Sequence, residues 1–137
     1  MEGFIKTTNN FHHHSRDAKR DAKNTRDRQR LAPFEGQKVA FRATFLRTGW
    51  RTSGTCGRTA LFQRLRMDDG RPVCDHVWIQ FDEVENPEVL TDANLGKELA
   101  FEGVPYRYFC ESGRRVYAAK YGIGHVTLKA GAHHTVD

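Results

Sequence analysis

Arginine and aromatic side chains occur together in two segments of this chain, one around Trp50 and the other around Tyr108. Guanidinium groups neutralise phosphates, and exposed flat rings stack on nucleobases with about 1–3 kcal/mol per base. Any single ring suits a buried core as well, but as a set at least two should be exposed. The predicted nucleic-acid-binding residues are Arg47, Trp50, Arg51, Arg58, Arg64, Arg66, Tyr106, Arg107, Tyr108, Arg114, Arg115 and Tyr117.

The charges are grouped by sign along the chain, although their sum is only mildly basic. The 137 residues contain 22 Lys and Arg against 17 Asp and Glu, a net charge of +5. Residues 36–67 hold seven bases and no acid, residues 75–102 hold eight acids and one base, and residues 103–129 are basic again. A fold that joins the two basic blocks would have a polarised surface.

The spacing of potential ligands and nucleophiles does not indicate a metal site or an enzyme. Cys56, Cys74 and Cys110 form no C-x-x-C pair, whereas a structural zinc site takes four ligands in paired spacing. Cys74 and His76 are near neighbours, but no nucleophile elbow or phosphate-binding glycine motif accompanies them. We therefore predict no metal, no cofactor and no catalysis. The odd number of cysteines favours a reducing, cytoplasmic setting over a disulfide scaffold.

The segments that must position the candidate residues are predicted to be β-strands. Alternating or continuous apolar residues predict strands over 39–49, 59–67, 73–81, 97–108 and 115–123, and residues 126–129 either continue the last strand or form a short sixth. Residues 49–57 have the composition of a loop, and Asp69-Gly70 is a hairpin signal. Residues 86–96 predict a short helix or turn that crosses the far end of the barrel and carries acids.

The third predicted strand has two different faces. His76, Trp78 and Gln80 alternate with Val77, Ile79 and Phe81, and the pattern leaves open which set faces the core. Because large aromatic residues are highly buried on average, we expect Trp78 to be a core residue rather than a stacking platform.

The N-terminal segment differs in composition from the rest of the chain. Residues 1–32 carry a net charge of +4 and few large apolar residues, and no apolar stripe is evident that would dock a helix. We expect residues 1–33 to be a basic arm, helical or disordered, residues 34–130 the folded domain, and residues 131–137 a disordered tail. Three adjacent histidines, His12 to His14, cannot all face one metal ion on a helix. No apolar run approaches 18 residues, so a membrane partner is not expected.

The predicted element order is β-β-β-α-β-β, which is typical of the five-stranded OB-fold barrel. An SH3-like barrel is the main alternative, but it normally lacks a helix between its third and fourth strands. In an OB fold, strands 2 and 3 and the loops after strands 1 and 4 form the binding face. The two basic, aromatic segments, around Trp50 and around Tyr108, lie on these strands and loops of the predicted fold.

Three segments carry a resemblance to a known group of proteins. They are residues 36–44 (GQKVAFRAT), Asp69-Gly70 followed by residues 75–79 (DHVWI), and residues 95–101 (LGKELAF). The region 34–130 resembles small OB-fold single-stranded nucleic-acid-binding proteins of phages and mobile elements. The resemblance implies an OB barrel that binds single-stranded DNA or RNA with little sequence preference, and it brings no catalytic residues. The alternative is a protein-binding module of a mobile element that inhibits or recruits a host defence or replication factor.

Overall fold

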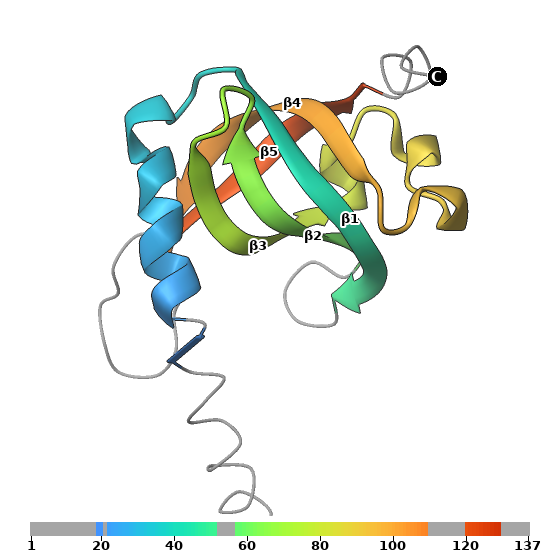
Figure 1. The fold of residues 1–137 in the computed structure, drawn as a ribbon, viewed down its shortest axis with the longest axis horizontal. Helices are drawn as coiled ribbons and strands as arrows, with labels where there is room; N and C mark the ends of the chain where they lie inside the picture. The colour runs from blue at the N-terminus through green and yellow to red at the C-terminus, as the bar shows by residue number, and fades with distance from the viewer. Residues whose placement is uncertain (1–18, 21, 52–56, 110–119, 130–137) are drawn as a thin grey trace, which may run out of the picture.

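A single curled antiparallel sheet forms the body of the protein. The computed structural model describes residues 19–20, 22–51, 57–109 and 120–129. Five strands, β1 (Val39–Arg51), β2 (Gly57–Met67), β3 (Pro72–Gln80), β4 (Glu98–Tyr108) and β5 (Lys120–Leu128), are arranged in the order β3-β2-β1-β4-β5 (Figure 1). The first four predicted strands are thereby confirmed to within a few residues. Of the fifth, predicted over 115–123, residues 120–123 are strand and residues 115–119 lie outside the described part of the chain. Residues 126–128 continue the fifth strand.

The sheet curls until its two edge strands approach each other, which makes an open barrel. A parallel bridge between Val84, just after β3, and Val126 of β5 joins the two edges. Register shifts in β1 next to β2 help it to bend, because a bulge increases the local twist of a strand. Inside the curl lie the rings of Phe41, Phe62 and Phe101, with neighbouring centroids 5.5 Å apart.

The connection between β3 and β4 contains three short 3-10 turns, which is the turn form of the predicted short helix or turn. These are η2 (Phe81–Glu83), η3 (Pro87–Val89) and η4 (Asp92–Asn94), of which η3 and η4 lie on the opposite side of the barrel from the N-terminal helix (Figure 1). Asn86 and Asn94 interrupt a continuous helix, because both amide side chains bond to backbone carbonyls, at 2.7 Å and 2.6 Å. The connection carries the exposed acids Asp82, Glu85, Glu88 and Asp92.

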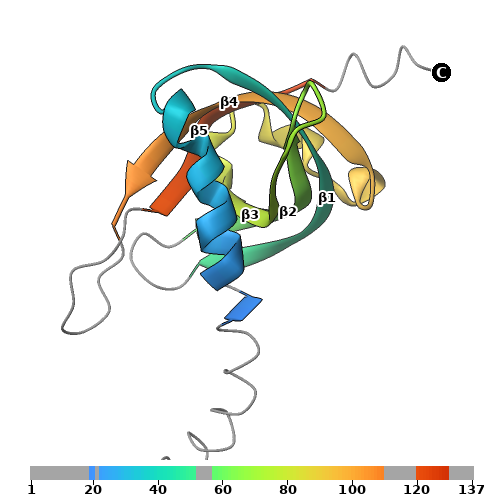
Figure 2. The same cartoon turned by 60° about the vertical axis from the view of Figure 1, so that its left-hand side comes forward.

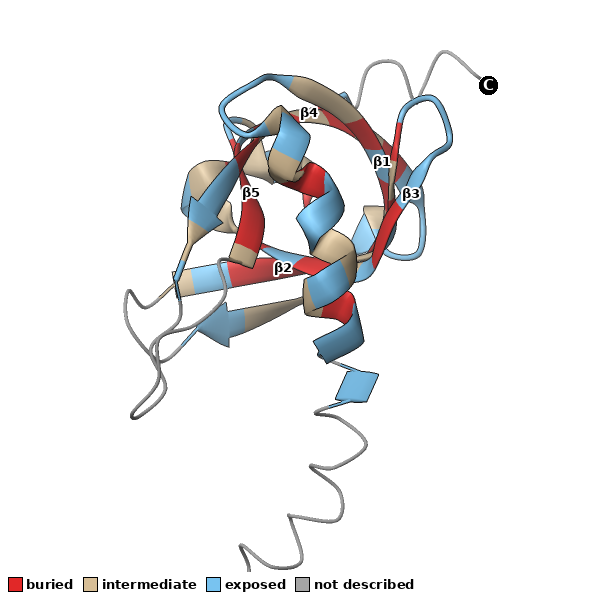
Figure 3. Cartoon of the chain, turned by 90° about the vertical axis from the view of Figure 1, so that its left-hand side faces the viewer, coloured by how far each residue is buried: buried red, intermediate tan, exposed pale blue. Residues whose placement is uncertain are grey.

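A basic helix packs against the barrel, which corrects the prediction that nothing in the N-terminal segment could dock it. Residues 22–28 are α-helical and continue into η1 (Gln29–Phe34); together these are the N-terminal helix. It lies across the opening between β3 and β5 (Figure 2). The helix is partly exposed and partly half-buried (Figure 3), but Leu31 is 0% exposed and belongs to the core. One fully buried leucine, with Ala32 and Phe34 beside it, replaces the long apolar stripe that the sequence lacks.

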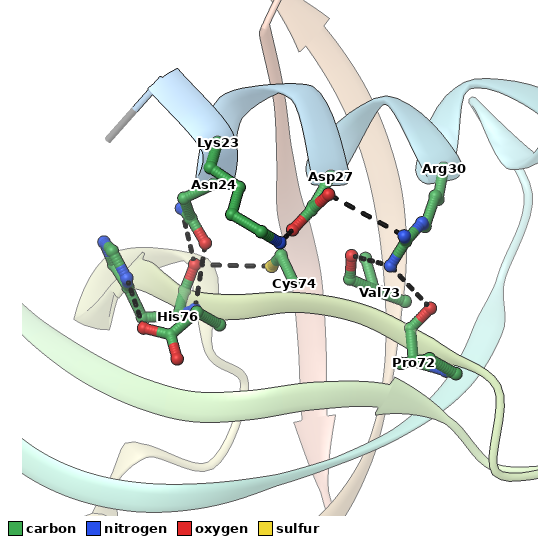
Figure 4. Close-up of polar contacts among 9 residues, drawn as sticks. Lys23, Asn24, Asp27, Arg30, Pro72, Val73, Cys74 and His76 are labelled. Atoms are coloured by element: carbon green, nitrogen blue, oxygen red, sulfur yellow. Dashed lines mark hydrogen bonds and ion pairs between the residues drawn. The ribbon is translucent and has the colours of Figure 1, made fainter. Parts of the chain in front are cut away.

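The helix also covers the free edge of β3 (Figure 4). The Asn24 amide donates to the His76 carbonyl at 3.0 Å, and its oxygen accepts the His76 N–H at 3.1 Å, as a neighbouring strand would. The Arg30 guanidinium donates to the carbonyl of Val73 at 3.1 Å. On the other edge, Asn86 caps Leu128 of β5 with the same pair of bonds, at 2.7 Å and 2.9 Å. Both sheet edges therefore have their backbone groups satisfied at these points, which blocks pairing with another strand there.

No helix among the described residues is long and apolar enough to span a membrane.

Candidate functional site

Two adjoining hollows, together called the groove, lie on the outer face of β2 and β3. The smaller hollow has a volume of about 370 Å³ and is lined by residues of β1, β2 and β3 and by Arg20. The larger has a volume of about 720 Å³ and extends to the ends of β1 and β4 and to the N-terminal helix. His76 and Trp78 line both hollows, so the two are parts of one surface.

Exposed aromatic rings give the groove its character. Trp50 is 71% exposed, Phe109 63%, and Trp78 and Tyr106 are each 42% exposed, and all four line the larger hollow with Tyr108. The prediction that Trp78 is a core residue is wrong. Val77 and Ile79 face the core instead, at 1% exposure each, and the alternation of the strand places Trp78 outside.

Two glycines determine how two of these rings lie. A Cβ atom built on Gly49 would be 3.3 Å from the indole of Trp78, and one built on Gly122 would be 2.9 Å from the ring of Tyr106. Tyr106 and Gly122 are direct partners across β4 and β5. Each ring therefore rests against bare backbone on one side. The position of each ring is set by the sheet rather than by a mobile loop, and part of its surface stays open to the groove.

Four arginines, from β1, from the N-terminal helix and from just before that helix, surround the rings. Arg28 of the N-terminal helix and Arg51 of β1 line the larger hollow, and Arg20 and Arg47 line the smaller one. The Arg47 guanidinium lies over the Trp78 indole, 5.2 Å from its centroid. Asp75 is the single acid among the described residues that line the groove. The groove is therefore positive, while the exposed acids of the β3–β4 turns line neither hollow.

Arg28 is held in place by its neighbours. Its Nη1 donates to the Tyr108 hydroxyl at 3.3 Å. Its Nε is shielded from solvent and has no hydrogen-bond partner among the described residues. A buried donor without a partner is costly, and among the described residues nothing offsets this cost at Nε.

Five of the residues predicted from the sequence meet in the groove, namely Arg47, Trp50, Arg51, Tyr106 and Tyr108. Four others line neither hollow. Arg58 lies over the Phe81 ring at 4.5 Å, Arg66 pairs with Glu98, Arg107 pairs with Glu35 at 3.8 Å, and Arg64 is exposed with a left-handed φ of 56°. Arg114, Arg115 and Tyr117 lie outside the described residues, in the segment that joins β4 to β5.

Sequence reasoning missed several groove residues, chiefly Trp78, Arg28 and Arg20. A signal for Trp78 was present, since it shares a strand face with the polar residues His76 and Gln80. A face of mixed polar and aromatic residues is more typical of a binding surface than of a core. No sequence signal placed Arg28 or Arg20, because their position depends on how the N-terminal helix docks.

The thiol beside the groove is not a reactive group. Cys74 is 7% exposed, and its sulfur donates to the His76 carbonyl at 3.3 Å. Burial raises the pKa of Cys74 to about 12, so the thiolate that nucleophilic or metal chemistry needs is not formed near neutral pH. His76 Nδ1 lies 3.2 Å from Asp75, but within the described part of the chain no three potential ligands gather around one point.

Burial also raises the pKa of Tyr106, helped by the nearby Tyr108 and Glu83. Its hydroxyl therefore stays protonated, and the ring stays neutral, across the physiological range. A neutral ring does not repel a phosphodiester chain.

Comparison of the chain with protein-family models, with curated proteins and with solved structures found no match. The resemblance to phage and mobile-element proteins therefore stays a prediction.

Proposed function

We propose that this protein is a non-catalytic single-stranded nucleic-acid-binding protein with an OB fold, and that the groove holds the strand. The observation that carries the proposal is the row of exposed rings, Trp50, Trp78, Tyr106 and Phe109, inside a groove lined with arginines. Stacking on such rings is available only to bases that are not already paired and stacked in a duplex. Single strands are therefore the natural ligand class.

The topology supports the OB assignment. In the sheet, β1 lies between β2 and β4, and the bridge from Val84 to Val126 brings the chain after β3 beside β5 in parallel. The groove lies on β2 and β3, and its larger hollow reaches Trp50 and Arg51 just before the β1–β2 connection and Phe109 just before the β4–β5 connection. This is where OB folds place their ligand face and its two flanking loops.

In this arrangement, the groups that supply binding affinity do not depend on which base is bound. Arginines supply phosphate neutralisation, which is independent of sequence and sensitive to salt. The rings contact any base, because every base has a flat face. Weak overall sequence preference follows from this division.

The chain contains only two tryptophans, and both line the groove, so intrinsic fluorescence reports directly on its occupancy. We expect oligo-dT to quench this fluorescence at low salt. If three or four groove arginines contact phosphates, the plot of log K against log salt should have a slope of about −2 to −3. Absence of quenching, together with unchanged anisotropy of a labelled oligo-dT at low salt, would refute the proposal.

A matched set of variants tests the location. Arg47→Gln with Arg51→Gln removes two groove charges and should reduce the salt slope by about 1.4. Arg107→Gln makes the same chemical change at an arginine outside the groove and should leave the slope within error. Equal effects of the two changes would mean that the strand does not follow the groove.

The same groove composition also favours a second candidate, a protein interface, because Trp, Tyr and Arg dominate binding hot spots. Under that function, oligonucleotides would fail to quench either tryptophan. The oligo-dT titration therefore separates the two candidates.

A further inference from the structure

The smaller hollow differs chemically from the rest of the groove. Beside the Trp78 ring and Arg47, it is lined by the Gln63 amide, the Asp75 carboxylate and the His76 imidazole. These are groups that read the edge of a base, and Asp75 is the acid among them, whereas five aromatic rings and no acid line the larger hollow. Its volume of about 370 Å³ falls in the range of small-molecule sites. Resting on the proposed function, we propose that this hollow holds one base of the bound strand and prefers guanine.

Asp75 is the feature that points to a particular base. A carboxylate in a groove that attracts phosphates opposes binding unless it meets hydrogen-bond donors of the ligand. Its side chain is 61% exposed, and one oxygen, Oδ2, lies 3.2 Å from Nδ1 of His76. That contact and the hollow's lining place the carboxylate at the rim of the hollow. Its acceptor capacity is not exhausted, because an ionised carboxylate has about four lone-pair sites.

A carboxylate only accepts hydrogen bonds. Among the common bases, only one presents two neighbouring donors that match it. Guanine presents N1–H and the N2 amino group side by side on its Watson–Crick edge, so both can donate to one carboxylate. Adenine and cytosine each place an acceptor next to their amino group. Thymine and uracil flank their single N–H with two carbonyl oxygens. For each of these bases, a carboxylate gains at most one bond and faces a lone pair as well.

The remaining groups of the hollow complement the other part of guanine. Gln63 lies directly opposite His76 across β2 and β3, on the face that carries Trp78. Its amide can donate to guanine O6, the acceptor next to N1. The Trp78 indole borders the hollow, and the base would stack on it in place of the Arg47 guanidinium, which lies over this ring in the free protein. The hollow thus combines a stacking surface, an acceptor pair and a donor.

The test uses three dT oligonucleotides of equal length that differ only at one central position, which holds dG, deoxyinosine or dA. Deoxyinosine lacks only the N2 amino group. We expect the dG oligonucleotide to bind about fivefold more tightly than the other two, the low end for a bidentate side chain–base pair because Asp75 is exposed. Equal affinity for all three, with oligo-dT binding intact, would overturn the guanine preference alone. Failure of every oligonucleotide to bind would instead refute the proposed function.

A charge-matched pair of variants assigns the preference to Asp75. Asp75→Asn keeps the shape but removes the ionised acceptor, so the dG oligonucleotide should lose its fivefold advantage. Binding of plain oligo-dT should be retained or strengthened, because a negative charge has left the groove. Asp92→Asn makes the same charge change in η4 and should leave the dG advantage intact. A preference that survives in Asp75→Asn would contradict the assignment.

Discussion

Replacing Leu31 by alanine tests whether the N-terminal helix belongs to the folded core. The Leu31 side chain is 0% exposed and is the buried apolar residue of η1. Removing a fully buried leucine side chain loses its transfer free energy and leaves a cavity, which together cost about 2.7–5.0 kcal/mol. The partly exposed Ala32 and Phe34 beside it allow some collapse, so we expect a loss of about 3 kcal/mol in the free energy of unfolding.

Urea denaturation followed by circular dichroism measures this loss. For a chain of this length, about 3 kcal/mol corresponds to a fall in Tm of roughly 10 °C. Leu95→Ala is the matched control, because Leu95 is 41% exposed and should cost less than about 1 kcal/mol. A Leu31→Ala protein as stable as the Leu95→Ala protein would show that the helix is not packed as described.

Three further predictions concern the groove and the core. Trp78→Ala should weaken oligo-dT binding about tenfold by removing one stacking surface, measured by anisotropy, while the Tm falls little because the ring is 42% exposed. Gly122→Ala should displace the Tyr106 ring, since the new Cβ would lie 2.9 Å from it, and should therefore weaken binding more than Gly57→Ala, whose Cβ meets nothing within 4 Å. Cys74 should resist iodoacetamide at pH 8 until the protein unfolds, as peptide mapping would show. Because its folded-state pKa is raised from 9.0 to about 12, its contribution to stability is complete below pH 9 and is lost as the pH rises towards 12.

The strands could be predicted from the sequence because their signals are local. Alternating apolar residues in β1 and the Asp69-Gly70 turn act within a few residues, and the structure follows both. The β3–β4 connection was harder. Asn86 is as compatible with a helix cap as with its observed role, which is to bond to Leu128, 42 residues away.

The candidate site depends on contacts between residues that are far apart in the sequence. Only part of the site could therefore be predicted. The arginines and rings at the ends of β1 and β4 were found because composition alone marks them. Arg28 lines the groove because Leu31 and Asn24 hold the N-terminal helix against the barrel. A single buried leucine does not form the apolar stripe by which a docked helix is recognised in a sequence. The exposure of Trp78 follows the polar neighbours on its own strand face rather than the average tendency of tryptophan to be buried, so the prediction from that average is wrong.

The glycines beneath the rings have a consequence for how such a surface can change during evolution. Trp78 depends on the bare backbone at Gly49, and Tyr106 depends on that at Gly122. A side chain gained at either glycine would displace a ring from beneath, without altering any residue that faces a ligand. In relatives of this chain, positions 49 and 78 should therefore vary together, as should positions 106 and 122. Loss of an aromatic residue at one position of a pair would free its glycine partner to change.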